Sequence, residues 1–90
     1  MTAERVRRIE QRLTDALQPS ELLIRDQSHL HAGHAGAQEG KGHFDIQIVS
    51  AAFLGQSLMQ RHRQIYDALG DMMETDIHAL KIRAKAPDEG

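Results

Sequence analysis

The chain has 90 residues, of which 40% are hydrophobic and 27% are charged, and its formal net charge at pH 7 is −2 with histidine counted as neutral. This length is enough for one core and too short for a core together with a deep, enclosed substrate pocket. The net charge is close to zero, so the chain lacks the overall positive charge that is typical of nucleic-acid-binding proteins. The absence of cysteine excludes disulfides.

The amino-terminal stretch MTAERVRRIEQRL mixes charges and has no apolar core, so it does not read as a secretory signal. No apolar run approaches the ~18 residues of a membrane-spanning helix. Together with the lack of cysteine, these features lead us to expect a cytoplasmic protein with no membrane contact.

The first predicted element is an amphipathic helix that starts after Thr2 and ends near Gln18, before Pro19. Its apolar residues recur at helical spacing, at Val6, Ile9, Leu13, Ala16 and Leu17. Residues 22–26 form a short apolar run that predicts a strand. Residues 27–42 hold four of the seven glycines and predict a loop.

Residues 43–50 alternate between apolar and polar side chains, which predicts a strand with one buried face. Residues 50–54 resemble one helical turn. Ser57 and Gln60 have the spacing of a capping box and predict the start of a helix that ends at Gly70. One arc of this helix carries the residues expected to face the core: Leu58, Met59, His62, Ile65, Tyr66 and Leu69.

Residues 71–75 predict a polar turn, and residues 77–85 alternate again as a last strand. In that alternation His78 shares a side with Leu80, Ile82 and Ala84. Residues 86–90 are expected to be a frayed tail. The element order predicts a single α+β domain over residues 1–90, with a three-stranded mixed sheet and the helices packed on one face.

Four of the six histidines fall within fifteen residues, at His29, His31, His34 and His43. A glycine-rich loop with several neutral nitrogen donors suits a borderline metal. A chain without a thiolate can supply only part of a soft-metal site. The pattern therefore predicts a metal site shared with another molecule.

Three segments together resemble the BolA family: DQSHLHAGH at 26–34, HFDIQIVSAAFLGQSLMQRHRQIYDAL at 43–69 and IHALKIRAKAP at 77–87. The resemblance implies an αββααβ fold similar to class II KH domains. It also implies two roles. One is partnership with a monothiol glutaredoxin around a shared [2Fe–2S] cluster in iron homeostasis, and the other is transcriptional regulation linked to stress response and cell morphology.

The resemblance carries two cluster ligands to this chain, His78 and His34. His29 and His31 are near enough in the loop to compete with His34, and His43 could be a supporting ligand. A [2Fe–2S] cluster needs four ligands, so one thiolate from the partner and one from glutathione would complete the set. The chain would then be a monomer alone or a heterodimer with its partner.

The alternative function is DNA binding through residues 57–69, which follow a helical turn and a glycine as in a helix-turn-helix. The candidate contacts are Gln60, Arg61, Arg63 and Gln64 on this helix and Lys81, Arg83 and Lys85 on the sheet. KH-type RNA binding is doubtful, because the matching turn lacks the second glycine of the GxxG loop.

Two other classes have less support. No serine or acidic residue has a recognisable nucleophile or base arrangement, so we expect no enzyme. A zinc or copper store built on the histidine-rich loop would need no partner and would tolerate loss of His78. Without the family resemblance, His62 reads as a core residue and His78 as a partly buried structural histidine.

Overall fold

The computed structural model describes residues 2–27 and 42–89. The helices are α1 (Thr2–Leu17), η2 (Ala51–Phe53), α3 (Leu58–Leu69), α4 (Met72–Thr75) and η3 (Pro87–Glu89), and the strands are β1 (Glu21–Asp26), β2 (Gly42–Val49) and β3 (Ile77–Lys85). None of the helices in these two ranges is both long and apolar enough to cross a membrane.

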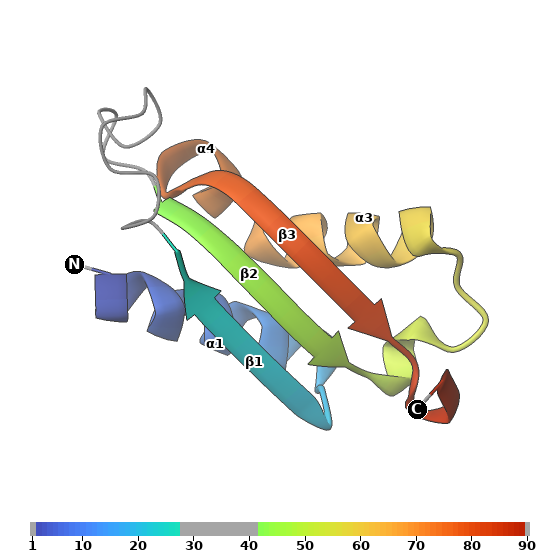
Figure 1. Cartoon of the computed structure of the whole chain (residues 1–90). Coiled ribbons are helices and arrows are strands. Elements are labelled where there is room, and N and C mark those ends of the chain that lie inside the picture. Colours follow the sequence, from blue (N-terminus) through green and yellow to red (C-terminus); the bar gives the residue numbers. More distant parts are fainter. Residues whose placement is uncertain (1, 28–41, 90) are drawn as a thin grey trace.

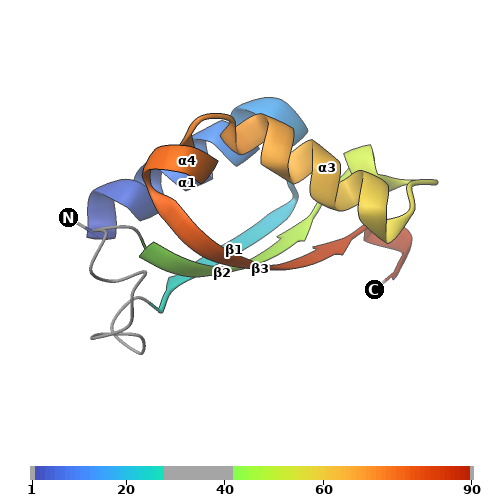
Figure 2. The ribbon, with the colours of Figure 1, turned by 90° about the horizontal axis from the view of Figure 1, so that it is seen from above.

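The three strands form one mixed sheet in the order β1-β2-β3. β2 lies in the middle, antiparallel to β1 and parallel to β3. The helices lie over one face of this sheet, as Figures 1 and 2 show from two directions. The predicted α+β fold, with a mixed sheet and helices on one face, is confirmed.

The core lies between the sheet and the helices. In β2, Phe44, Ile46 and Ile48 are buried and the residues between them are half-buried, so the predicted alternation is confirmed. Across from this face, α1 and α3 contribute Ile9, Leu13, Leu17, Ile65 and Leu69. Burying an aliphatic side chain stabilises the fold by roughly 1.5–3 kcal/mol, which is why the alternation fixes the face that β2 presents.

Buried Ser50 connects the end of α1 to the exit from β2. Its hydroxyl donates to the carbonyl of Leu17 at 2.6 Å and accepts from the amide of Ala52 at 3.1 Å. One side chain thus satisfies an orphan carbonyl at the end of α1 and an orphan amide at the start of η2.

Both predicted boundaries of α3 are confirmed. The Ser57 hydroxyl accepts from the amide of Gln60, and the Gln60 side chain accepts from the amide of Ser57, which completes the capping box. Gly70 ends the helix at a φ of 55°, a conformation that favours glycine.

The buried face of α3 differs from the predicted arc. Arg61, Ile65 and Leu69 are buried, whereas Leu58 and Met59 remain 67% and 74% exposed. His62 is half-buried and Tyr66 is exposed. Arg61, Ile65 and Leu69 are spaced four residues apart and form the side of α3 that faces the core. The predicted core-facing side was therefore rotated about the helix axis relative to the observed one.

Two other segments differ from the prediction. The polar turn at 71–75 contains the short helix α4, and Met72 at its start is fully buried in the core. The expected frayed tail instead has Ala86 buried and η3 held by Glu89, whose carboxylate accepts from the amide of Ala86 and from Arg61. The ionic contact fixes residues 86–89.

Candidate functional site

Two of the predicted ligand residues, His43 and His78, lie together where β2 and β3 begin. Because these strands are parallel, both start at the same end of the sheet. The centroids of the two imidazole rings are 5.1 Å apart, and the ring planes are tilted by 53°. The sequence reading named both residues but did not predict that they touch.

A β-bulge explains why His78 is exposed. Gly42 lies opposite Ile77, whereas His43 lies opposite Ala79, so His78 is the extra residue in β3. The bulge lets Ile77 and Leu80 both contribute to the core while His78 and Ala79 stay exposed. The prediction that His78 shares a buried face with Leu80 is therefore wrong, because strict alternation fails at this position.

Asp76 anchors the backbone just before His78. Its carboxylate accepts from the Thr75 hydroxyl at 2.6 Å, from Arg8 at 3.2 Å and from Arg5 at 3.3 Å, and its carbonyl accepts from the amide of Gly42 at 2.8 Å. The Thr75 hydrogen bond, followed by the charges of Arg8 and Arg5, lowers the pKa of Asp76 below its ordinary value. The start of β3 is thereby fastened to both α1 and β2.

The remaining predicted ligands, His29, His31 and His34, fall in residues 28–41, outside the described residues. Both flanks of that segment lie at the histidine edge. On one side the amide of Gln27 donates to the carbonyl of His43 at 2.8 Å, and on the other Gly42 begins β2. Gln27 and Gly42, the described residues on either side of this segment, therefore both lie at the edge that carries His43 and His78.

The chemistry of this edge suits a shared metal centre. Within residues 2–27 and 42–89, no group of three or more histidine, cysteine or acidic side chains could hold a metal ion alone. A [2Fe–2S] cluster with two imidazole and two thiolate ligands is a known combination. The exposed imidazole of His78, in a chain with no thiolate, fits one nitrogen ligand of such a set, whereas His43 is half-buried against it and its Nε2 atom is buried.

The predicted DNA-binding residues lie on two different sides of the fold. Lys81, Arg83 and Lys85 are exposed on the face of the sheet opposite the helices, while Arg63 and Gln64 are on α3. Gln60 is exposed but its side chain is used in the capping box. The structure does not bring these residues together into one surface.

Arg61 corrects the alternative most clearly. It was predicted to contact DNA, yet its side chain is only 8% exposed. It donates to the carbonyls of Gln56 at 2.9 Å and Ala84 at 3.1 Å and makes two 2.6 Å contacts with the carboxylate of Glu89. Its position four residues before Ile65 was the available signal that it faces the core.

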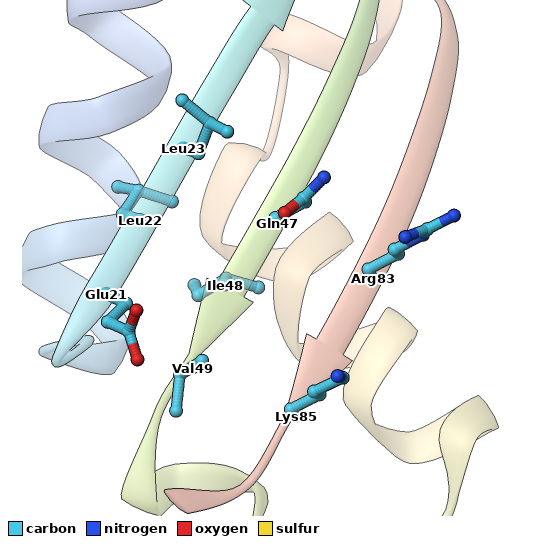
Figure 3. Close-up of a pocket in the computed structure, with 8 residues that line it drawn as sticks. All are labelled: Glu21, Leu22, Leu23, Gln47, Ile48, Val49, Arg83 and Lys85. Atoms are coloured by element: carbon cyan, nitrogen blue, oxygen red, sulfur yellow. The ribbon is translucent and has the colours of Figure 1, made fainter. Parts of the chain in front are cut away.

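A shallow hollow of about 350 Å³ lies at the other end of the sheet, where β2 and β3 finish (Figure 3). Sequence reasoning named Arg83 and Lys85 but missed Gln47 and Glu21, which stand beside them on the open face. A second hollow on α3 is lined by Met59, His62, Arg63 and Tyr66. Met59, His62 and Tyr66 belonged to the arc that was predicted to face the core, whereas Arg63 was predicted to be exposed.

The fold and the histidine edge define a small α+β domain of the BolA type. The family model described as BolA-like protein matches residues 13–89, and the chain belongs to the BolA family. In the solved structures, the BolA domain of SufE1 from Arabidopsis thaliana has a TM-score of 0.84 at 46% identity and covers 96% of this chain and 95% of that domain.

Curated relatives include longer proteins. The chain is 47% identical to SufE-like protein 1, chloroplastic/mitochondrial, from Arabidopsis thaliana, over 91% of this chain and 24% of that protein. It is 42% identical to Protein BOLA1, chloroplastic, from the same plant, over 94% of this chain and 55% of that protein. It is also 39% identical to the DNA-binding transcriptional regulator BolA of Escherichia coli, over 83% of this chain and 69% of that protein.

Proposed function

We propose that this chain is an adaptor that donates two histidine ligands to a [2Fe–2S] cluster shared with a monothiol glutaredoxin, and so takes part in iron homeostasis. His78 is the first ligand and His34 the second. The partner and a glutathione supply the thiolates. In this arrangement the cluster, when bound, provides the iron chemistry, and the chain provides nitrogen donors and a docking edge.

The observation that carries the proposal is the contact between His43 and His78 at an exposed edge of the sheet. The bulge turns His78 outward, and Asp76 holds the backbone beside it. Gln27 and Gly42, which flank His34 in the sequence, both lie at this edge. Their position supports the proposal that His34 and His78 bind one centre.

His43 has a positioning role in this proposal. Its ring lies against that of His78 and restricts the directions in which the His78 nitrogen lone pairs can point. A ligand whose orientation is fixed before binding loses less conformational entropy when it binds. His43→Phe keeps a ring at this place and removes both nitrogen donors.

The test is reconstitution of the full chain with a monothiol glutaredoxin, iron, sulfide and glutathione, read by visible absorption and circular dichroism. His78→Ala and His34→Ala should each abolish or shift the visible circular dichroism of the mixed complex, whereas His43→Phe should weaken binding and keep the spectrum. His62→Ala is the matched control, since His62 lies on α3 against Tyr66. Identical spectra for wild type, His34→Ala and His78→Ala would refute the ligand assignment.

A second candidate function is DNA binding in transcriptional regulation of stress response and cell morphology. It is favoured by relatives from Escherichia coli and Haemophilus influenzae that are named DNA-binding transcriptional regulator BolA, at 39% and 38% identity. Lys81, Arg83 and Lys85 form an exposed basic row on the sheet that could bind phosphates. Arg63 and Gln64 lie on a separate surface, on α3.

A DNA titration at two salt concentrations tests this candidate. Replacing Lys81, Arg83 and Lys85 by glutamine should reduce the salt dependence of binding if the open face contacts phosphates. Replacing Arg63 and Gln64 by alanine should instead change sequence preference if α3 enters a groove. Binding with a steep salt slope and no sequence preference would leave only general phosphate attraction.

A further inference from the structure

The outer edge of β1 offers backbone groups for pairing. The amide of Gln27 donates to the carbonyl of His43. In the antiparallel register of β1 and β2, this bond determines which residues of β1 direct their backbone groups toward β2 and which direct them toward the outer edge. Hydrogen-bonded pairs alternate along an antiparallel ladder, so Glu21, Leu23 and Arg25 exchange hydrogen bonds with β2. Leu22 and Ile24 direct their amides and carbonyls outward. Among the described residues, Leu22 and Ile24 make no further backbone hydrogen bond outside the sheet ladder.

The sequence of this strand is complementary to itself. Read antiparallel about Leu23, the segment ELLIR places Glu21 of one copy opposite Arg25 of the other, and this happens twice. Leu22 then lies opposite Ile24, and Leu23 lies opposite Leu23. The outward-directed residues Leu22 and Ile24 become the hydrogen-bonded pairs, and the charged residues become the pairs whose side chains approach most closely.

Other two-fold registers between two copies of β1 do not place Glu21 opposite Arg25. A two-fold pair must place residues of the same parity opposite each other, since they share a face of the sheet. If the two-fold axis passes by Leu22 or Ile24 instead of Leu23, Leu23 lies opposite Glu21 or Arg25. Moving the axis by two residues puts Glu21 opposite Glu21 or Arg25 opposite Arg25, which is repulsive.

The charges available for this pairing are exposed. Within residues 2–27 and 42–89, neither Glu21 nor Arg25 forms an ion pair. Arg25 lies in register with Asp45, and Asp45 with Lys81. Glu21 of a second copy would extend this row, so that the sign of the charge alternates across the two molecules.

The apolar part of the edge fits the same partner. Leu23 is 43% exposed on the open face, and Leu22 and Ile24 are only partly buried on the helix side. Figure 3 shows Glu21 and Leu23 on β1, with Gln47 and Arg83 on the next two strands. A second β1 would cover Leu23 with Leu23 and would continue the helix-side apolar row.

We propose that this chain pairs with a second copy of itself through β1, which gives a continuous six-stranded sheet, three strands from each copy. The antiparallel arrangement leaves the two His43–His78 pairs at opposite ends of the dimer. The dimer contact therefore does not use the histidine edge, and the proposal is independent of the function proposed above.

Sedimentation velocity across a range of protein concentrations tests the pairing. Glu21→Arg and Arg25→Glu each place two like-charged pairs across the contact and should raise the dimer dissociation constant at least about tenfold. The double variant Glu21→Arg with Arg25→Glu restores opposite charges and should recover dimerisation. Glu74→Arg, an exposed charge reversal on α4, is the control and should leave the constant unchanged.

Amide hydrogen exchange supplies a second measurement. The amides of Leu22 and Ile24 should be protected at concentrations where the dimer forms and exchange freely in the single variants. A chain that stays monomeric up to about millimolar concentration, or a dimer that both single variants leave intact, overturns the proposal. Protection of these amides only on adding a different protein would assign the edge to another partner and would also overturn it.

Discussion

Arg61 and Glu89 form a bidentate ion pair in which both nitrogen–oxygen distances are 2.6 Å. The guanidinium also donates to the carbonyls of Gln56 and Ala84, so one side chain connects the start of α3, the end of β3 and η3. This contact makes Arg61 part of the scaffold and removes it from any surface that binds DNA.

Arg61→Ala should lower the free energy of unfolding, because it leaves the buried carbonyl of Ala84 without its donor and releases η3. Arg63→Ala, two residues away and exposed, is the matched control and should change stability little. Thermal unfolding of the two variants measures the difference. Equal melting temperatures would contradict the scaffold role.

The same ion pair predicts a pH dependence of stability. The hydrogen bonds from Arg61 and the amide of Ala86 lower the pKa of Glu89 from 4.5 to about 2. A carboxylate with a depressed pKa in the folded state stabilises the fold fully above its unfolded pKa and loses that contribution as the pH falls toward the folded value. The stability difference between wild type and Glu89→Gln should therefore be constant above pH 5 or so and shrink between about pH 4.5 and 2.

Chemical denaturation at several pH values measures this difference, with Asp67→Asn, an exposed acid of α3, as the control. A gap between wild type and Glu89→Gln that stays unchanged down to about pH 2 would contradict the assignment of the lowered pKa to Glu89.

Ser50→Ala should destabilise the fold by about 1–3 kcal/mol, since it leaves the buried carbonyl of Leu17 without its donor and removes the cap of η2. Ser20→Ala removes an exposed hydroxyl whose contact with Val49 is longer, at 3.3 Å, and should cost less than about 0.5 kcal/mol. Urea denaturation of both variants checks the contrast. If both variants lose a similar free energy of unfolding, the burial of Ser50 does not determine its contribution to stability.

Two glycines of positive φ offer a further comparison. Gly70 and Gly55 have φ values of 55° and 73°, and the ψ of −127° places Gly70 outside the left-handed helical region, so alanine should cost roughly 1–3 kcal/mol at these positions and more at Gly70. A Cβ at Gly70 would also lie 3.3 Å from Arg12, which donates to the carbonyl of Leu69, whereas a Cβ at Gly55 meets open space. Gly70→Ala should be the more destabilising variant in urea denaturation, and the reverse order would contradict the packing argument.

Periodicity in the sequence predicted the parts of the fold that follow regular geometry. The alternation of Phe44, Ile46 and Ile48 fixed the face of β2, and the Ser57–Gln60 spacing fixed the start of α3. These signals are local, because each depends on residues within one element.

The errors arose where a distant contact or an irregularity decides the outcome. The burial of Arg61 depends on Glu89, 28 residues away, and Leu58 is exposed despite its apolar side chain. The exposure of His78 depends on a bulge against Gly42 and His43, which alternation within β3 cannot reveal. Of the predicted site, His43 and His78 proved adjacent, while His29, His31 and His34 lie outside the described residues and stay predictions.

The most direct test of the shared cluster is to label only this chain with ¹⁵N-histidine, form the complex with the unlabelled glutaredoxin, and record pulsed electron paramagnetic resonance of the reduced cluster. We expect strong ¹⁵N couplings from two imidazole nitrogens, with His78→Ala removing one of them and His62→Ala removing none. A reduced cluster with no ¹⁵N coupling from this chain would contradict the account.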